Sequence, residues 1–256
     1  ASDVYKRQAR ECGARPFIMG NGTNLLIPDR GLDRLVIRTA GEMSDVRLTD
    51  ETVIEADAGI SLSRLALFAQ SQALTGLEFA HGIPGSLGGA VFMNAGAYGG
   101  EMKQVVQEVI VLTEDGIRHI PGAECAFGYR KSAFSDGKTV ILGAKLHLKK
   151  GDPAQIRDKM TELMAKRKAS QPLEYPSAGS TFKRPEGYYA GTLIQETGLK
   201  GLTVGGAQVS EKHAGFVINT GGATCADVMA LIAQVQDRVM QRSGVHLEPE
   251  VRIIEN

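Results

Sequence analysis

Residues 82–100 constrain the fold of this chain more than any other segment, because seven of them are glycines. Glycine weakens helices and strands, and it suits positions where the backbone turns tightly or is approached closely by another group. Gly85, Gly88 and Gly89 surround Ser86, which favours a backbone approached by a flat or phosphorylated ligand. A purely structural bend is the alternative. We expect this window to form a ligand-binding loop.

A second glycine-rich segment, residues 20–24, has the sequence Gly-Asn-Gly-Thr-Asn and separates two apolar runs at 16–19 and 25–27. The pattern predicts a strand, a tight turn and a second strand. It lacks the strand-to-helix context of the dinucleotide-binding fingerprint. Its backbone N–H groups can still form an anion-binding nest, although an ordinary hairpin turn explains the residues equally well.

The two glycine-rich loops lie about 60 residues apart, and strands are expected between them. This arrangement suggests one diphosphate-containing cofactor that lies across both loops.

The charge and cysteine content exclude several classes of protein. Lys and Arg total 29, as do Asp and Glu, so no charge imbalance indicates a nucleic acid or an anionic membrane as a partner. The cysteines, Cys12, Cys125 and Cys225, form no CxxC pair. This indicates a reducing compartment and argues against a disulfide framework. The histidines form no HxxH or HExxH pattern, so no metal site is expected.

No apolar run approaches the ~18 residues that a membrane-spanning helix needs, and no signal-peptide pattern is present. We therefore expect a cytoplasmic protein.

Apolar periodicity and turn residues predict the remaining elements. Strands are expected at 34–38, 52–56, 105–113, 139–148, 216–219 and 245–254. Helices are expected at 5–12, 61–74, 153–170, 193–197 and 226–243, and a glycine-rich loop at 177–185.

Three polar residues are candidates for chemistry: Arg130, Ser180 and Glu250. Ser180 has no neighbouring histidine or lysine motif that would activate a nucleophile, so a hydroxyl proton donor is the better interpretation. Glu250, with Arg252 beside it, could stabilise a transient enolate. Each residue also has an ordinary interpretation, as a surface cation, a turn residue and half of an ion pair, and the residues alone leave both open.

Six segments, taken in order, carry a resemblance to a known family: residues 20–26, 82–90, 94–99, 128–130, 178–185 and 247–252. Over nearly its whole length the chain resembles the UDP-N-acetylenolpyruvoylglucosamine reductases, flavoenzymes of peptidoglycan precursor synthesis. Only 49 residues separate Arg130 from Ser180, which leaves little room for the tyrosine-bearing insertion of the longer family type. The resemblance is therefore to the shorter, type II form.

The resemblance implies an α+β fold with two domains. Residues 1–150 would form a vanillyl-alcohol-oxidase-type (PCMH-like) FAD-binding domain, and residues 151–249 a smaller α+β substrate-binding domain. A final strand at 250–256 would return to the FAD-binding domain. The family's N-terminal strand with its Gly-Gly-Pro segment is absent, so we expect an N-terminally truncated chain.

The resemblance also implies a reaction. NADPH reduces FAD, the nicotinamide leaves, and the enolpyruvyl nucleotide-sugar enters the same cleft. The flavin delivers hydride to C3, Ser180 gives a proton to C2, and Arg130 and Glu250 stabilise the developing charge. The product is UDP-N-acetylmuramate. We expect a monomer that binds this nucleotide-sugar but no nucleic acid, membrane or metal.

The resemblance further implies two sets of binding residues. The FAD contacts would be Gly20, Asn21, Gly22, Thr23, Asn24, Leu25, Gly82, Ile83, Pro84, Gly85, Ser86, Gly88, Gly89, Ala90, Asn94 and Gly96. The substrate contacts would be Tyr129, Lys183, Arg184 and His213. Arg184 and His213 stand where the longer type has an asparagine and a glutamine, and we expect Lys183, Arg184 and His213 to contact the diphosphate or uridine, since cations suit phosphate.

Two rival functions remain at this stage. A flavin-dependent oxidase or dehydrogenase of the same superfamily would keep the glycine-rich loops but need neither Ser180 nor Glu250. A nucleotide-sugar binding module would carry out no chemistry.

Overall fold

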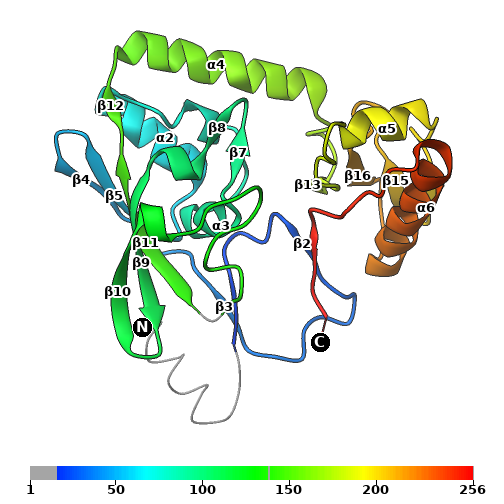
Figure 1. Cartoon of the computed structure of the whole chain (residues 1–256), viewed down its shortest axis with the longest axis horizontal. Helices are drawn as coiled ribbons and strands as arrows, with labels where there is room; N and C mark the ends of the chain where they lie inside the picture. The colour runs from blue at the N-terminus through cyan, green and yellow to red at the C-terminus, as the bar shows by residue number, and fades with distance from the viewer. Residues whose placement is uncertain (1–15, 138, 256) are drawn as a thin grey trace. The chain divides into compact units, whose positions relative to one another are not determined.

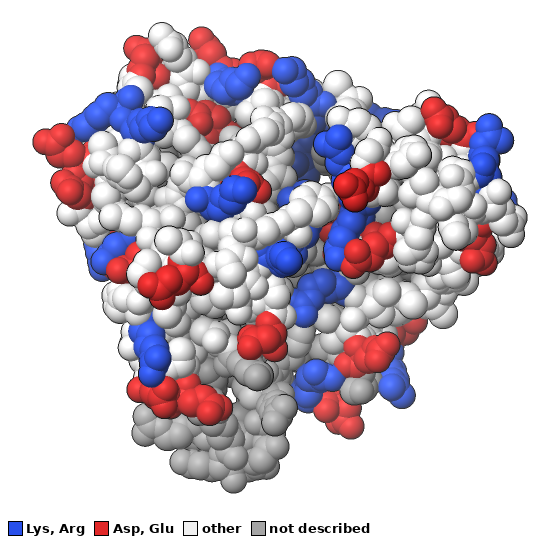
Figure 2. Space-filling model, viewed as in Figure 1, with Lys and Arg blue, Asp and Glu red and all other residues white. Residues whose placement is uncertain are grey.

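The computed structural model describes residues 16–137 and 139–255, so the helix expected at 5–12 lies outside the described residues. The chain divides into two compact units. Unit 1 comprises residues 1–22 and 34–166, and unit 2 comprises residues 23–33 and 167–256. Within the described residues, no helix is long and apolar enough to cross a membrane. Acidic and basic side chains are interspersed over the face shown in Figure 2.

Unit 1 is built on a five-stranded antiparallel sheet in the order β10-β9-β11-β5-β4 (Figure 1). The strands are β4 (Val46–Asp50), β5 (Val53–Asp57), β9 (Val106–Thr113), β10 (Gly116–Pro121) and β11 (Val140–His147). β11 lies at the centre because most of its side chains are apolar and buried, whereas the edge strands β4 and β10 are largely exposed.

Smaller elements complete unit 1. The paired strands are β1 (Phe17–Met19) with β3 (Val36–Arg38), β6 (Leu74–Thr75) with β12 (Lys149–Lys150), and β7 (Gly96–Ala97) with β8 (Gly100–Glu101). The helices are α2 (Leu62–Ser71), α3 (Leu87–Met93) and α4 (Pro153–Ser170), whose last turn belongs to unit 2. Single 3-10 turns lie at η1 (Glu78–Ala80), η2 (Met102–Gln104) and η3 (Gly122–Glu124).

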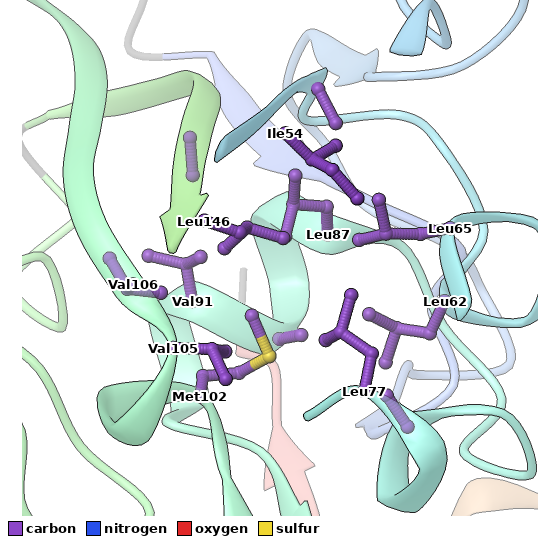
Figure 3. Packing of buried hydrophobic residues seen from close by; sticks show 14 of the residues in the cluster. Ile54, Leu62, Leu65, Leu77, Leu87, Val91, Met102, Val105, Val106 and Leu146 are labelled. Carbon is purple, nitrogen blue, oxygen red and sulfur yellow. The ribbon is translucent and has the colours of Figure 1, made fainter. Parts of the chain in front are cut away.

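The core of unit 1 lies between this sheet and the helices α2 and α3 (Figure 3). α2 begins where the Ser61 hydroxyl accepts the Arg64 N–H, and it buries Leu62, Leu65, Ala66 and Ala69 at helical spacing. The helix predicted at 61–74 is confirmed with a shorter C-terminal end.

The helix α3 corrects the expectation that residues 82–100 form only a loop. Leu87, Ala90 and Val91 are buried, which is the spacing of an amphipathic helix. A Cβ atom on Gly88 would lie 2.9 Å from the Cβ of Ala58. The glycine lets the helix pack closely against the segment after β5, and this packing outweighs the low helix propensity.

Unit 2 is built on a four-stranded antiparallel sheet in the order β13-β16-β15-β14. The strands are β13 (Ser177–Ser180), β14 (Thr203–Val204), β15 (Ala207–Val209) and β16 (Phe216–Asn219), and the helices are α5 (Ala190–Glu196) and α6 (Cys225–Ser243). α6 has a capping box between Thr224 and Asp227 and ends at Gly244, in the left-handed conformation. Residues 177–185 therefore contain a strand, where only a loop was expected.

The strands predicted on either side of residues 20–24 are present, as β1 and β2 (Leu25–Leu26). They do not form a hairpin, because β1 pairs with β3 while β2 pairs in parallel with β17 (Arg252–Ile253). The final strand is therefore only two residues long, rather than spanning 245–254. Pro249, which has no N–H to donate, makes only an isolated bridge with Phe182.

Burial on α2 gives a test of the unit 1 core. Leu65 is fully buried and Leu67 is 49% exposed on the same helix. We expect Leu65→Ala to lower the free energy of unfolding by about 2–5 kcal/mol, because it leaves a cavity, and the control Leu67→Ala to change it by less than about 0.5 kcal/mol. Urea unfolding checks both. Equal effects of the two substitutions would contradict this packing.

Candidate active site

The two glycine-rich segments identified from the sequence meet inside unit 1. A Cβ atom on Gly20 would overlap the Oγ atom of Ser86, and it would lie 4.0 Å from the backbone nitrogen of Gly89. Only glycine fits at position 20 while Ser86 stays where it is. The loops therefore come together, as a ligand lying across both would require.

Within residues 16–137 and 139–255, Ser86 has a polar atom that is left unsatisfied. The residue is 2% exposed, and its Oγ atom has no hydrogen-bond partner among the described residues. It stands before α3 without capping that helix, while the N–H groups of Leu87 and Gly88 donate to Ile60 O (2.9 Å) and Ala58 O (2.8 Å). A buried unsatisfied hydroxyl costs about 1–3 kcal/mol. A ligand that bonds this hydroxyl would remove the cost.

The segment 20–25 is divided between the units, since the chain passes from unit 1 to unit 2 after Gly22. Asn21 accepts a hydrogen bond from Arg38 Nη2 at 3.3 Å. Asn24 belongs to unit 2, where its amide donates to the carbonyl of Glu250 at 3.1 Å. Two asparagines of one predicted cofactor loop thus bond to different parts of the protein.

Arg130 lies on a tight turn in unit 1. Gly128 and Lys131 bond to each other across the turn, at 3.0 Å and 3.3 Å. Arg130 adopts a left-handed conformation with φ +54°, which is strained for a side-chain-bearing residue. Its Nη2 donates to the carbonyl of Gly96 at 3.4 Å, and its guanidinium lies 5.1 Å from the ring centroid of Tyr129. The turn presents an ordered guanidinium, backed by an aromatic ring.

Asn94 ends α3 in the left-handed conformation and is 1% exposed. Its amide nitrogen donates to Glu101 Oε2 at 2.9 Å and to the carbonyl of Gly128 at 3.1 Å. Its Oδ1 accepts the Lys103 N–H at 2.9 Å. All hydrogen-bonding groups of the side chain of this predicted FAD contact, except one acceptor lone pair, are used inside unit 1.

In unit 2, Thr181 links its neighbour Ser180 to the segment that contains Glu250. The Glu250 N–H donates to the Thr181 carbonyl at 2.8 Å. The Thr181 N–H bonds to Gly215 O (2.8 Å), and its hydroxyl accepts the Val217 N–H at 3.0 Å. Thr181 is 4% exposed. A buried residue with three hydrogen bonds therefore holds the backbone of Ser180 beside the segment that carries Glu250.

Ser180 itself is exposed, and its hydroxyl donates to the Phe182 carbonyl at 3.3 Å. The pairing of β13 with β16 shifts register between Ser177 and Ser180, and Gly179 has φ +84°. An irregularity of this kind redirects a side chain that would otherwise follow the pleat of the sheet. The glycine before Ser180 makes this local shape possible.

The predicted substrate cations are held in different ways. Lys183 pairs with Glu248, so its charge is partly balanced within unit 2. Arg184 Nε donates to the carbonyl of Tyr188 at 3.3 Å, and its guanidinium stacks 4.0 Å from the ring centroid of Tyr189. Stacking and the Nε bond order the guanidinium before any ligand arrives.

His213 lies in surroundings that disfavour its charged form. Burial lowers the pKa of its imidazole below the ordinary value. Its Nδ1 accepts the Gly215 N–H at 3.1 Å, so in the neutral ring the proton resides on Nε2. Phe216 packs edge-on against the ring, with 5.0 Å between centroids. In this form His213 offers a hydrogen-bond donor at Nε2.

Sequence reasoning missed three residues that hold these groups: Glu101, Thr181 and Ser132, whose hydroxyl donates to the Phe92 carbonyl at 2.8 Å. Glu101 follows the last glycine of the 82–100 window, and this position was the only signal available for it. Among residues 16–137 and 139–255, no three His, Cys, Asp or Glu side chains gather in a way that could hold a metal ion.

Comparison with known proteins matches both parts of the chain. Residues 6–120 match a family described as "FAD binding domain". Residues 171–254 match "UDP-N-acetylenolpyruvoylglucosamine reductase, C-terminal domain".

Full-length UDP-N-acetylenolpyruvoylglucosamine reductases are similar to this chain along most of their length. The UDP-N-acetylenolpyruvoylglucosamine reductase of Caldanaerobacter subterraneus subsp. tengcongensis is 51% identical over 93% of this chain and 78% of the relative. That of Pediococcus pentosaceus is 51% identical over 96% and 82%. The crystal structure of the Thermus caldophilus reductase superposes with a TM-score of 0.86 at 37% identity, covering 98% of this chain and 89% of that one.

The residues of unit 1 fit an FAD group. The unsatisfied Ser86 hydroxyl offers a hydrogen bond to a polar atom of the cofactor, and Gly20, which has no side chain, lets the two glycine-rich loops meet beside that hydroxyl. Both features lie within the segment that matches the FAD-binding family.

Ser86 gives a test of this fit. We expect Ser86→Ala to leave the thermal midpoint of the flavin-free protein unchanged or raised, because the substitution removes an unsatisfied buried polar atom. The same substitution should weaken FAD binding by about 0.5–1.5 kcal/mol, the value of one hydrogen bond. Fluorescence titration of the flavin-free protein measures the second effect.

Ser132→Ala is the matched control, since the buried hydroxyl of Ser132 bonds to Phe92 O (2.8 Å) and the Phe134 N–H (3.3 Å). That substitution should lower the thermal midpoint. Unaltered FAD affinity in Ser86→Ala would show that this hydroxyl does not bind the cofactor.

Proposed function

Because this chain belongs to the UDP-N-acetylenolpyruvoylglucosamine reductase family, we propose that Ser180, Arg130 and Glu250 perform the reduction of UDP-N-acetylglucosamine enolpyruvate to UDP-N-acetylmuramate. The observation that carries the proposal is the 2.8 Å bond from the Glu250 N–H to the carbonyl of Thr181. It supports a shared role for the hydroxyl at 180 and the carboxyl at 250.

The bound flavin, reduced by NADPH, supplies the hydride that adds to C3 of the enolpyruvyl group. Gly20 and Ser86 are the unit 1 residues whose surroundings fit this cofactor. The other proposed contacts are Asn21, Gly22, Thr23, Asn24, Leu25, Gly82, Ile83, Pro84, Gly85, Gly88, Gly89, Ala90 and Gly96. The side chain of Asn94, by contrast, is bonded to protein groups.

Ser180 is the proposed proton donor. Hydride addition at C3 leaves negative charge on C2 and the adjoining carboxylate, and C2 must then take a proton. A hydroxyl within hydrogen-bond reach of C2 supplies that proton and regains one from water. The exposed Ser180 side chain, on an irregular strand, suits a group that meets a ligand.

Arg130 and Glu250 are the proposed stabilising groups. A fixed guanidinium stabilises a developing oxyanion, because it needs no reorganisation when the charge appears. The left-handed turn, the bond to Gly96 and the Tyr129 ring supply this order. Glu250 can stabilise negative charge only as a neutral acid that donates a hydrogen bond, and we propose that it acts in this form.

We propose that Tyr129, Lys183, Arg184 and His213 contact the nucleotide-sugar. Arg184 suits the diphosphate, since an ordered guanidinium binds phosphate oxygens at a low entropic cost. The neutral His213 ring would donate a hydrogen bond from Nε2.

We also propose which part of the chain binds each ligand. Residues 1–150 would bind FAD, residues 151–249 would bind the substrate, and residues 250–256 would rejoin the FAD-binding part. We propose a monomer that acts in the cytoplasm, where NADPH and nucleotide-sugars are found, and that binds neither nucleic acid nor membranes.

A shared superfamily fold allows other flavin reactions, and one assay separates them. The purified protein should show a flavin absorption band, which a simple nucleotide-sugar binding module would lack. NADPH oxidation that requires the enolpyruvyl nucleotide-sugar would distinguish the proposed reductase from a flavoenzyme acting on another molecule.

Ser180→Ala tests the proton donor. We expect the variant to retain FAD and to be reduced by NADPH at the normal rate, but to transfer hydride to the substrate about 10²- to 10³-fold more slowly, as after loss of a donor in comparable sites. Anaerobic stopped-flow absorbance follows flavin reduction and reoxidation separately. Ser177→Ala, on the same strand, is the control, and it should behave as the unaltered protein. Normal reoxidation in Ser180→Ala would refute the assigned role.

Arg184→Ala tests the phosphate contact. We expect the affinity for UDP to fall by about 1.5–3 kcal/mol, the value of a hydrogen bond to a charged group, while flavin reduction by NADPH stays unchanged. Calorimetric titration with UDP measures the loss. Arg238→Ala, which alters an exposed arginine bonded to Gln234 on α6, is the matched control. Equal affinities of the two variants would remove Arg184 from the site.

A further inference from the structure

The turn that carries Arg130 is tied at both ends to the C-terminal end of α3. On one side, the Asn94 amide donates to the carbonyl of Gly128 at 3.1 Å. On the other side, the hydroxyl of Ser132 donates to the carbonyl of Phe92 at 2.8 Å. Gly128 and Ser132 enclose the turn, so these two partly buried bonds fix its position on the helix.

We propose that Asn94 and Ser132 are positioning residues for Arg130, and that Asn94 serves this role instead of contacting FAD. The inference rests on the catalytic role proposed for Arg130. It concerns only residues of unit 1.

The orientation of the Asn94 amide is set by its other partners. Glu101 Oε2 accepts one of its two amide protons at 2.9 Å, and Lys103 N–H donates to its Oδ1 at 2.9 Å. Glu101 is itself paired with the Lys103 ammonium at 2.8 Å. The remaining amide proton is therefore directed to Gly128. Asparagine meets all these requirements because it also tolerates the left-handed conformation at a helix end.

The β7–β8 hairpin joins this network to Arg130 itself. Gly96 and Glu101 are cross-strand partners in the hairpin. Glu101 bonds to Asn94, while the carbonyl of Gly96 accepts the bond from Arg130 Nη2. Asn94, which supports the turn, and Gly96, which accepts the bond from the guanidinium, thus belong to one hydrogen-bonded network. A strained conformation such as that of Arg130 persists only where its surroundings hold it in this way.

Asn94→Gly tests the inference, because glycine keeps the left-handed backbone and removes only the side chain. We expect normal FAD content and normal flavin reduction by NADPH, with reoxidation by the enolpyruvyl nucleotide-sugar slowed about 10- to 100-fold, the effect of misplacing a catalytic group by about 1 Å. Ser132→Ala should slow the same step. Thr75→Val is the control, since it removes a partly buried bond to Glu78 elsewhere in unit 1 and should not alter reoxidation.

A double-mutant cycle separates positioning from a general loss of stability. If Asn94 acts through Arg130, Asn94→Gly slows reoxidation in the unaltered protein but causes no further slowing in an Arg130→Ala background. Independent, multiplicative effects would overturn the inference, as would loss of bound FAD from Asn94→Gly. Should that variant fail to fold, the same cycle with Ser132→Ala decides the matter.

Failure of the inference differs from failure of the proposed function. Normal reoxidation in Arg130→Ala alone would refute the catalytic role of Arg130, and with it the inference. Slow reoxidation in Arg130→Ala, together with normal reoxidation in both Asn94→Gly and Ser132→Ala, would overturn the inference only.

Discussion

The close packing of α3 against the sheet of unit 1 is the contact on which the candidate site of that unit depends. Gly88 allows the approach to Ala58, and the helix contacts both β11 and β5. The residue before the helix, Ser86, lies where the two glycine-rich loops meet, and the residue after it, Asn94, bonds to the turn of Arg130. A short buried helix of this kind transmits position well, because a packed interior has few alternative arrangements.

In unit 2, backbone hydrogen bonds hold the candidate groups in place. Thr181 uses its N–H, carbonyl and hydroxyl to bond to three different residues, and this fixes the backbone of the exposed Ser180 relative to that of the partly buried Glu250. Because the bonds belong to a buried residue, breaking any of them would leave an unsatisfied polar group. Chemical groups can therefore stay exposed to a ligand while their positions remain fixed.

Much of the fold follows from local pattern. The helices expected at 153–170 and 226–243 and the strand at 216–219 agree with α4, α6 and β16, since each has clear periodicity or clear end signals. The prediction was wrong where tertiary contacts outweigh local preference. The packing of Gly88 on Ala58 makes a helix inside a glycine-rich window, and the partners of β1 and β2 come from distant segments. Secondary-structure propensity alone predicts neither this helix nor these strand pairings.

The sequence by itself determined the family, and with it the candidates Arg130, Ser180 and Glu250, because six motifs in a fixed order are specific in a way that no single motif is. Only the tertiary structure decided how these candidates are held. It directed the amides of Asn24 and Asn94 to protein carbonyls, gave the Ser86 hydroxyl no partner among the described residues and aimed the Gly215 N–H at Nδ1 of His213. The physical reason is that hydrogen-bond partners and burial depend on residues far apart in the chain, which no local pattern specifies.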